Sequence, residues 1–199
     1  MGIYEIIQPD AYICLADYEY CQGNFRFHPI QKNEIEMIRN WRNSQTEILR
    51  QNNIISRDEQ EMYFRDFVFV EYKKEKPNLI LFSIHESGNF IAYGGLVHID
   101  WLENNAELSF LMSNEKVLNS EIYKDTIKNF ITFMKYIAFE ELNLSKIFTE
   151  TYPERRFHIN CLEKNGFIPN VSKPTFFKDI VTKNDSVFHS IGKYSSLSL

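Results

Sequence analysis

Three titratable side chains lie within apolar, strand-like stretches of the sequence, where they can take part in proton transfer. Glu107 lies in a predicted strand over residues 106–112, and His98 and Asp100 lie in the stretch before it. Because side chains alternate between the faces of a strand, His98 and Asp100, two residues apart, are expected on one face. A carboxylate or imidazole in such a place can accept a proton. It can equally form an ion pair or cap a turn.

The composition limits the kinds of protein that this chain can be. It has 199 residues, of which 44% are hydrophobic and 25% charged, a balance typical of a globular protein. No apolar run is long enough to cross a bilayer, and the N-terminus lacks the pattern of a secretory signal, so we expect a cytoplasmic protein without membrane contact. The net charge of −5 argues against nucleic acid as a partner.

Cysteine and histidine spacing predicts neither disulfides nor a metal. Cys14, Cys21 and Cys161 form no CxxC pair, and three is not the even number of a disulfide scaffold. The five histidines are scattered, with no spacing typical of metal ligands. We therefore expect reduced thiols and no metal.

The periodicity of apolar residues predicts an α/β domain with a mixed sheet. A strand over 24–30 is followed by two helices, one from Asn33 and one that Ser56 caps and that runs toward Tyr72. The remaining elements are strands over 78–85, 90–101 and 106–112, a long amphipathic helix, a strand over 146–151, a helix over 154–165 that ends before Gly166, and strands over 175–181 and 186–191.

The chain divides into three parts on this pattern. Residues 1–22 alternate loosely, which favours a small strand pair ahead of the main fold. Residues 23–192 form the main domain, and residues 193–199 are expected to fray.

Several short motifs follow one another along the chain. They are IRNWRN at 38–43, Gln45 with LRQ at 49–51, Gln60 with YF at 63–64, YGGLVHI at 93–99, AELSF at 106–110, AFEELNLSKI at 138–147 and LEKNGF at 162–167. Together with the order of the elements, these motifs resemble the GNAT N-acetyltransferases. The resemblance covers about residues 24–191, and its first part is similar to a bacterial branch associated with cell-surface sugar biosynthesis.

The resemblance implies transfer of an acetyl group from acetyl-CoA to an amine. Glu107 matches a strand position where some members carry a general base, and His98 and Asp100 are candidates to assist or to hold the acceptor. Backbone groups of the same strand would hold the pantetheine arm and polarise the thioester. The residues in question are Phe110, Leu111 and Met112.

Two motifs depart from the family pattern. No glycine lies between Gly95 and Gly166, so the loop that usually holds the CoA pyrophosphate is degenerate. Its candidate replacements are the helix start at Asn119 and Ser120 and the side chain of Lys124. In the last helix Leu162 replaces the usual tyrosine acid, which leaves Tyr152 or His158 as proton donor and Arg155 as phosphate partner.

The expected acceptor is a small-molecule amine, and the sub-branch resemblance favours an amino group on a nucleotide-linked sugar. The candidate acceptor residues are Arg42, Gln45, Arg50, Tyr63 and Asp100. A protein or peptide amine is one alternative, and a non-catalytic ligand-binding or interaction protein of the same fold is another. Aromatic residues at 176, 177 and 188 either close the core or pair two subunits in a homodimer.

Overall fold

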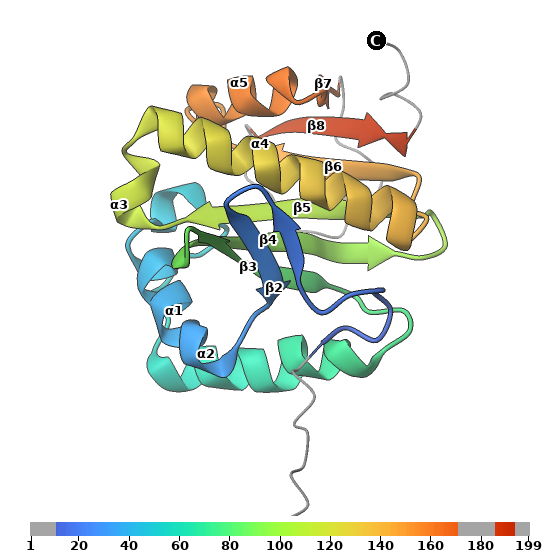
Figure 1. The fold of residues 1–199 in the computed structure, drawn as a ribbon. Coiled ribbons are helices and arrows are strands. Elements are labelled where there is room, and N and C mark those ends of the chain that lie inside the picture. Colours follow the sequence, from blue (N-terminus) through green and yellow to red (C-terminus); the bar gives the residue numbers. More distant parts are fainter. Residues whose placement is uncertain (1–10, 171–185, 194–199) are drawn as a thin grey trace, which may run out of the picture.

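The computed structural model describes residues 11–170 and 186–193, which form a mixed sheet with helices on both faces (Figure 1). The strand order is β1-β2-β3-β4-β5-β6-β8-β7, and only the β5–β6 pair is parallel among these strands. This confirms the predicted α/β class. The strands are β1 Tyr20–Gln22, β2 Phe25–Pro29, β3 Ile80–Glu86, β4 Asn89–Asp100, β5 Asn105–Met112, β6 Lys146–Thr151, β7 Ile168–Pro169 and β8 Val187–Gly192.

The helices are shorter and more interrupted than the periodicity predicts. They are α1 Ile35–Asn43, α2 Arg57–Tyr63, α3 Asn114–Val117, α4 Ser120–Tyr136 and α5 Arg156–Lys164. Short 3-10 turns precede α1 at Lys32–Glu34, follow it at Thr46–Ile48, and form Phe69–Lys73; π-helical turns form Phe64–Val68 and Ile137–Glu141.

The predicted cap of the second helix is present. The Ser56 hydroxyl accepts a hydrogen bond from the Glu59 N–H at 3.3 Å, and the Glu59 carboxylate accepts one from the Ser56 N–H at 2.7 Å. The α-helix nevertheless ends at Tyr63, and the chain continues through the π and 3-10 turns to Lys73. The last helix also ends as expected, because Gly166 has φ +92.

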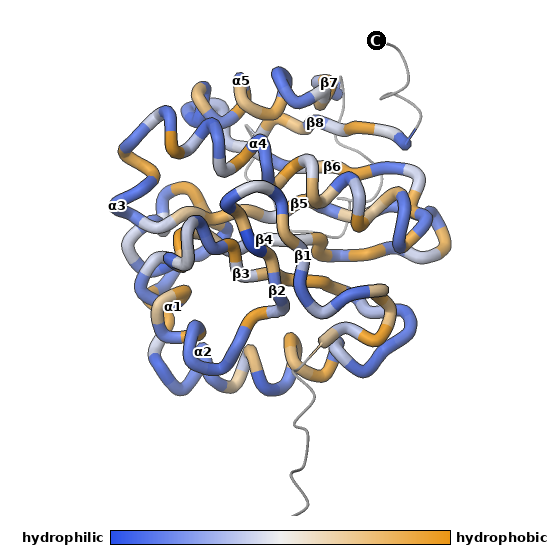
Figure 2. Tube along the Cα trace, viewed as in Figure 1, coloured by the Kyte–Doolittle hydropathy of each residue, from blue (hydrophilic) through white to orange (hydrophobic). Residues whose placement is uncertain are grey.

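Helices α4 and α1 pack on opposite faces of the sheet. The Phe133 ring of α4 stacks on Phe27 of β2 at 4.2 Å between centroids, while Trp41 of α1 meets Phe90 of β4 at 4.7 Å. In Figure 2 the tube of α4 alternates between hydrophobic and hydrophilic turns, as a helix with one buried face should. The same helix crosses in front of the strands in Figure 1.

Two glycines allow β4 to lie close to its neighbours. A Cβ on Gly94 would meet the Ser109 carbonyl oxygen and lie 2.9 Å from the Phe130 ring. A Cβ on Gly95 would collide with the Ile80 carbonyl. Any other residue at these positions would force the sheet or α4 to move.

The two parallel strands in the middle of the sheet pair over only part of their length. β5 and β6 are in register at Asn105–Lys146, Ala106–Ile147 and Glu107–Phe148, whereas β5 continues to Met112 and β6 to Thr151. Beyond Glu107 the strands diverge, so the sheet is split at the centre of the molecule.

Some predictions for the two ends of the chain fall partly on residues that the structure does not describe. Within residues 11–22 the only strand is β1, which pairs with β2, and the rest of the stretch predicted as a strand pair, residues 1–10, lies outside the described residues. The strand predicted over 175–181, with the aromatics at 176 and 177, lies outside the described residues, while Phe188 is buried. Among the described residues, no helix is long and apolar enough to span a membrane.

Candidate active site

A cavity of about 380 Å³ lies where β5 and β6 diverge. Its walls come from both strands, from α1 and the chain after it, and from the start of α5. Most of the residues selected from the sequence are among those that line it: Arg42, Arg50, Tyr63, His98, Glu107, Phe110, Tyr152, Arg155 and His158.

Arg50 joins the two diverging strands through two buried carboxylates. Its guanidinium donates to Glu107 of β5 and to Glu150 of β6, and the Glu107 and Glu150 side chains are only 7% and 2% exposed. Burial lowers the pKa of Arg50, but the two carboxylates outweigh it and raise the pKa above its ordinary value. The arginine thus stays charged and holds the strands together at the point where their ladder ends.

His98 approaches the same carboxylate from β4. Its Nδ1 lies 2.8 Å from Glu107 Oε2, and the ring is about half exposed. A β-bulge makes this contact, because His98 has φ +49 and β4 carries one extra residue there relative to β5. Asp100, two residues further along β4, accepts the N–H groups of Leu102 and Glu103 in the following turn and is not among the residues that line the cavity.

Arg42 enters the cavity from α1. Its guanidinium donates to the Tyr93 hydroxyl at 3.1 Å, and among the described residues it forms no ion pair. The nearby Tyr93 oxygen raises the pKa of Arg42 above its ordinary value, although burial of the guanidinium acts in the opposite direction. Tyr63 lines the same part of the cavity. Gln45 instead points away and donates to the Met112 carbonyl at 2.9 Å.

The part of the cavity wall between the end of β6 and the start of α5 contains the candidate proton donors. Tyr152 follows β6, and burial raises the pKa of its hydroxyl. Burial and the neighbouring Arg155 hold the pKa of His158 well below its ordinary value, so this ring is neutral at pH 7. The Tyr123 hydroxyl lies 2.7 Å from His158 Nδ1 and accepts a bond from Arg155 at 3.4 Å.

The backbone of β5 beyond Glu107 faces the split. Leu111 and Met112 are buried side chains of the core, whereas Phe110 lines the cavity. On the β6 side these residues have no strand partner within residues 11–170 and 186–193. Their peptide groups are consequently the part of the strand that can meet a ligand.

The start of α4 is already occupied by its own cap. The Asn119 side chain accepts the N–H groups of Glu121 and Ile122, at 3.1 and 3.2 Å. Ser120 is exposed, and Lys124 pairs with Glu121 at 2.6 Å. None of the three expected phosphate contacts, Asn119, Ser120 and Lys124, lines the cavity.

Two residues of the site went unnoticed in the sequence. Glu150 follows Phe148 at period two in a predicted strand, so a buried carboxylate beside Glu107 was open to inference from the parallel pairing. Tyr123 reads as an ordinary core residue of an amphipathic helix, and nothing in its spacing predicts its contact with His158.

Solved structures of other proteins share this fold. Among solved structures, the spermidine N-acetyltransferase of Vibrio cholerae in a dodecameric, intermediate state matches with a TM-score of 0.69 at 16% identity, covering 89% of this chain and 98% of that one. The same Vibrio cholerae enzyme in complex with CoA and spermine matches with a TM-score of 0.69 at 15% identity, covering 88% and 99%. No curated protein matches the sequence.

The family of the chain is shown by its amino-acid sequence. A family model described as an acetyltransferase (GNAT) domain matches residues 28–191, which is most of the chain and includes both strands of the split, β5 and β6. This chain therefore belongs to the GNAT acetyltransferases.

Proposed function

We propose that the protein transfers an acetyl group from acetyl-CoA to a primary amine of a small molecule. The observation that carries the proposal is the split between β5 and β6, which brings the Glu107–His98 pair beside an open strand edge. One side of this cavity offers peptide groups for a thioester, and the other offers groups that can take a proton from an amine. A structure of similar fold binds CoA, which supports acetyl-CoA as the donor.

The donor would lie along β5. Peptide groups of Phe110, Leu111 and Met112 would hold the pantetheine arm and polarise the thioester carbonyl. Because Asn119 already satisfies the first N–H groups of α4, the pyrophosphate must depend more on side-chain cations. Arg155, at the cavity wall, is the cation best placed for it.

The acceptor amine must lose a proton before it can attack. We assign this role to the Glu107–His98 pair: Glu107, held by Arg50, accepts the Nδ1–H of His98 and makes Nε2 the basic nitrogen. The amine nitrogen then forms a bond to the thioester carbon, and the C–S bond of the resulting intermediate breaks. The thiolate takes a proton from Tyr152 or from the Tyr123–His158 pair.

The acceptor is best explained as an amine that also carries an anion. Arg42 is a cation in the cavity wall that no carboxylate neutralises in the described chain. Guanidinium groups bind phosphate and carboxylate in a bidentate manner. A nucleotide-linked amino sugar has such a phosphate. Binding of a polyamine would need carboxylates that have no cationic partner in the protein. Glu107 and Glu150 do not meet this need, because both form ion pairs with Arg50.

The test is a panel of acceptors incubated with acetyl-CoA and analysed by mass spectrometry. The panel contains nucleotide-linked amino sugars, spermidine and a peptide with a free N-terminus. We expect acetylation of the sugar nucleotide, and acetylation of spermidine or the peptide alone would contradict the acceptor proposal. Failure to bind acetyl-CoA at millimolar concentration in a calorimeter would contradict the reaction itself.

Variants separate the roles within the site. His98→Gln and Glu107→Gln should each lower kcat by roughly 100-fold or more and flatten the acid limb of the pH profile. Arg42→Gln should raise KM for an anionic acceptor with little change in kcat, because it removes binding shared by ground and transition states. Unchanged turnover in both His98→Gln and Glu107→Gln would remove the pair from the mechanism.

A further inference from the structure

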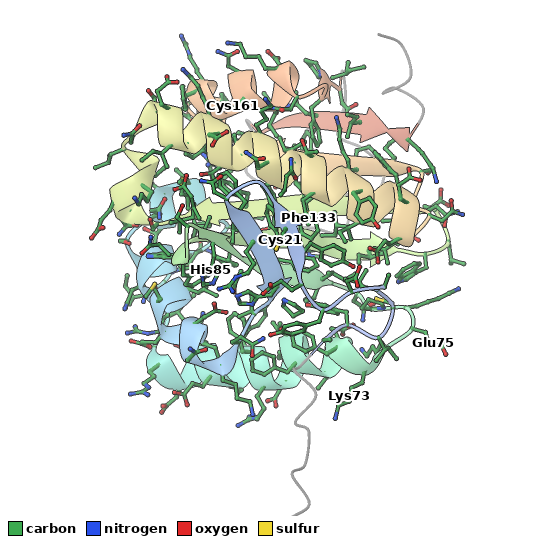
Figure 3. All side chains as sticks on the ribbon, viewed as in Figure 1. Cys21, Lys73, Glu75, His85, Phe133 and Cys161 are labelled. Carbon is green, nitrogen blue, oxygen red and sulfur yellow. The ribbon has the colours of Figure 1, made fainter. Side chains whose placement is uncertain are left out.

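Two neighbouring segments of the chain and a third, distant one converge on the α1 face of the sheet, outside the cavity. His28 of β2, Glu34 of the turn before α1 and His85 of β3 place one ligand atom each within 4.8 Å of one another. His85 is labelled in Figure 3. We propose that these three residues bind a divalent transition-metal cation, with Zn²⁺ as the best match. None of them lines the acetyl-transfer cavity.

The carboxylate is oriented as a metal ligand would be. Glu34 Oε2 accepts hydrogen bonds from the Ser83 hydroxyl at 2.5 Å and from the Gln31 N–H at 2.7 Å. These two donors turn the other oxygen, Oε1, toward the imidazoles, 2.9 Å from His85 Nε2 and 3.7 Å from His28 Nε2. Outer donors that fix a ligand in this manner are a regular feature of metal sites.

The tautomer of His28 supplies the second argument. Its Nδ1 lies 3.0 Å from the Pro29 carbonyl oxygen, which can only accept, so Nδ1 carries the hydrogen. In a neutral ring, Nε2 then directs a lone pair at a carboxylate oxygen 3.7 Å away. Two lone pairs facing each other are stabilised by a cation between them.

The donor set selects the class of metal. Two imidazole nitrogens and one carboxylate oxygen suit Zn²⁺ and other first-row divalent ions better than Mg²⁺ or Ca²⁺, which prefer all-oxygen sites. The rings are held in place: the His28 and His85 centroids lie 4.7 Å apart, and His85 stacks on Phe90 at 5.2 Å. A cation here would tie β2, β3 and the entry to α1 together.

Calorimetric titration of EDTA-treated full-length protein with ZnCl₂ tests the site. We expect one Zn²⁺ per chain, and binding at least tenfold weaker in His28→Gln and in His85→Gln. Cys21→Ser, which removes an exposed thiol, is the matched control and should bind as the wild type does. No Zn²⁺ binding by the wild type, or equal binding by both histidine variants, overturns the proposal.

The absorption spectrum of Co²⁺ bound to the wild-type protein tests the site without relying on the folding of the histidine variants. Co²⁺ bound by nitrogen and oxygen ligands gives weak visible bands, whereas cysteine ligands add strong thiolate-to-metal absorption in the near ultraviolet. We expect the first spectrum and a higher Tm with metal. Thiolate bands, or a Tm that neither Zn²⁺ nor EDTA alters, would mean that the three residues form a metal-free hydrogen-bonded network.

Discussion

Arg50 is the residue on which the site depends most, because it satisfies two carboxylates from two strands. Glu107 and Glu150 would otherwise face each other in a buried position at the end of the β5–β6 ladder. The arginine comes from the chain between α1 and α2 and therefore also links those helices to the middle of the sheet. Arg50 therefore has a structural role that does not depend on whether it also binds the acceptor.

Replacement of Arg50 by Met should lower the free energy of unfolding by about 3 kcal/mol, because it leaves uncompensated buried charge. Urea denaturation at pH 7 measures the loss. The double variant Arg50→Met with Glu150→Gln should recover part of it, since one carboxylate then remains instead of two. A double variant no more stable than Arg50→Met would show that charge is not the cause.

At the scale of the elements, β4 depends on the absence of a side chain at Gly94. Gly94→Ala should cost roughly 1–3 kcal/mol, because the new methyl meets the Ser109 carbonyl and the Phe130 ring. Gly88→Asn is the control: Gly88 lies in an open turn at φ +83, a conformation that Asn tolerates better than other residues. Thermal unfolding compares the two, and equal losses of Tm would contradict the packing argument.

The turn Phe69–Lys73 contains a carboxylate that should make stability depend on pH. Glu71 is buried, and burial by itself would raise the pKa of its carboxyl group. Hydrogen bonds from Lys74 and Asn78 outweigh this effect and lower the pKa. A lowered folded pKa stabilises the fold above the unfolded value of about 4.3, and the contribution disappears as the pH falls through the folded pKa.

Glu71→Gln should therefore destabilise the protein by roughly 2 kcal/mol at pH 7 and by progressively less below pH 4. Urea denaturation across this pH range measures the difference. The exposed Glu75, labelled in Figure 3, provides the control Glu75→Gln, which should change little. A loss in Glu71→Gln that does not shrink in acid would point to packing instead of charge.

Elements with one strong periodicity were predictable, and their interruptions were not. The strand over 146–151 is found with the same bounds, and β4 and β5 lie within one residue of their predicted ends. The helix predicted from Asn33 ends at Asn43, and α3 and β7 were missed. A four-residue helix or a two-residue strand is too short for its apolar residues to show a recognisable period.

The candidate site shows the same limit. Polar residues within apolar strands, such as Glu107 and His98, could be found from pattern alone. The contact of Arg50 with these strands could not be found in this way, because Arg50 and Glu150 are 100 residues apart in the sequence and meet only in the folded chain. The two histidines of the proposed metal site looked scattered for the same reason, since β2 and β3 bring them together across 50 residues of helix and turn.

For the whole molecule, the split predicts how the backbone responds to a ligand. Amide hydrogens of residues 109–112 should exchange faster than those of β3, whose two neighbours are both strands. Saturating acetyl-CoA should slow exchange at 109–112 and leave β3 unchanged. Hydrogen exchange followed by mass spectrometry resolves these segments, and equal protection throughout would contradict binding along β5.

The order of strands also matters while the chain is being synthesised. β1 to β5 are neighbours in the sheet in the order in which they are synthesised, whereas β6, the next strand to pair with β5, is separated from it in the sequence by the whole of α3 and α4. A nascent chain that ends before Lys146 thus exposes the full outer edge of β5, an apolar strand that can pair with another chain. The strand that later covers this edge does so at only three residues, so the same opening that admits a ligand is the place where an unfinished molecule is most exposed to aggregation.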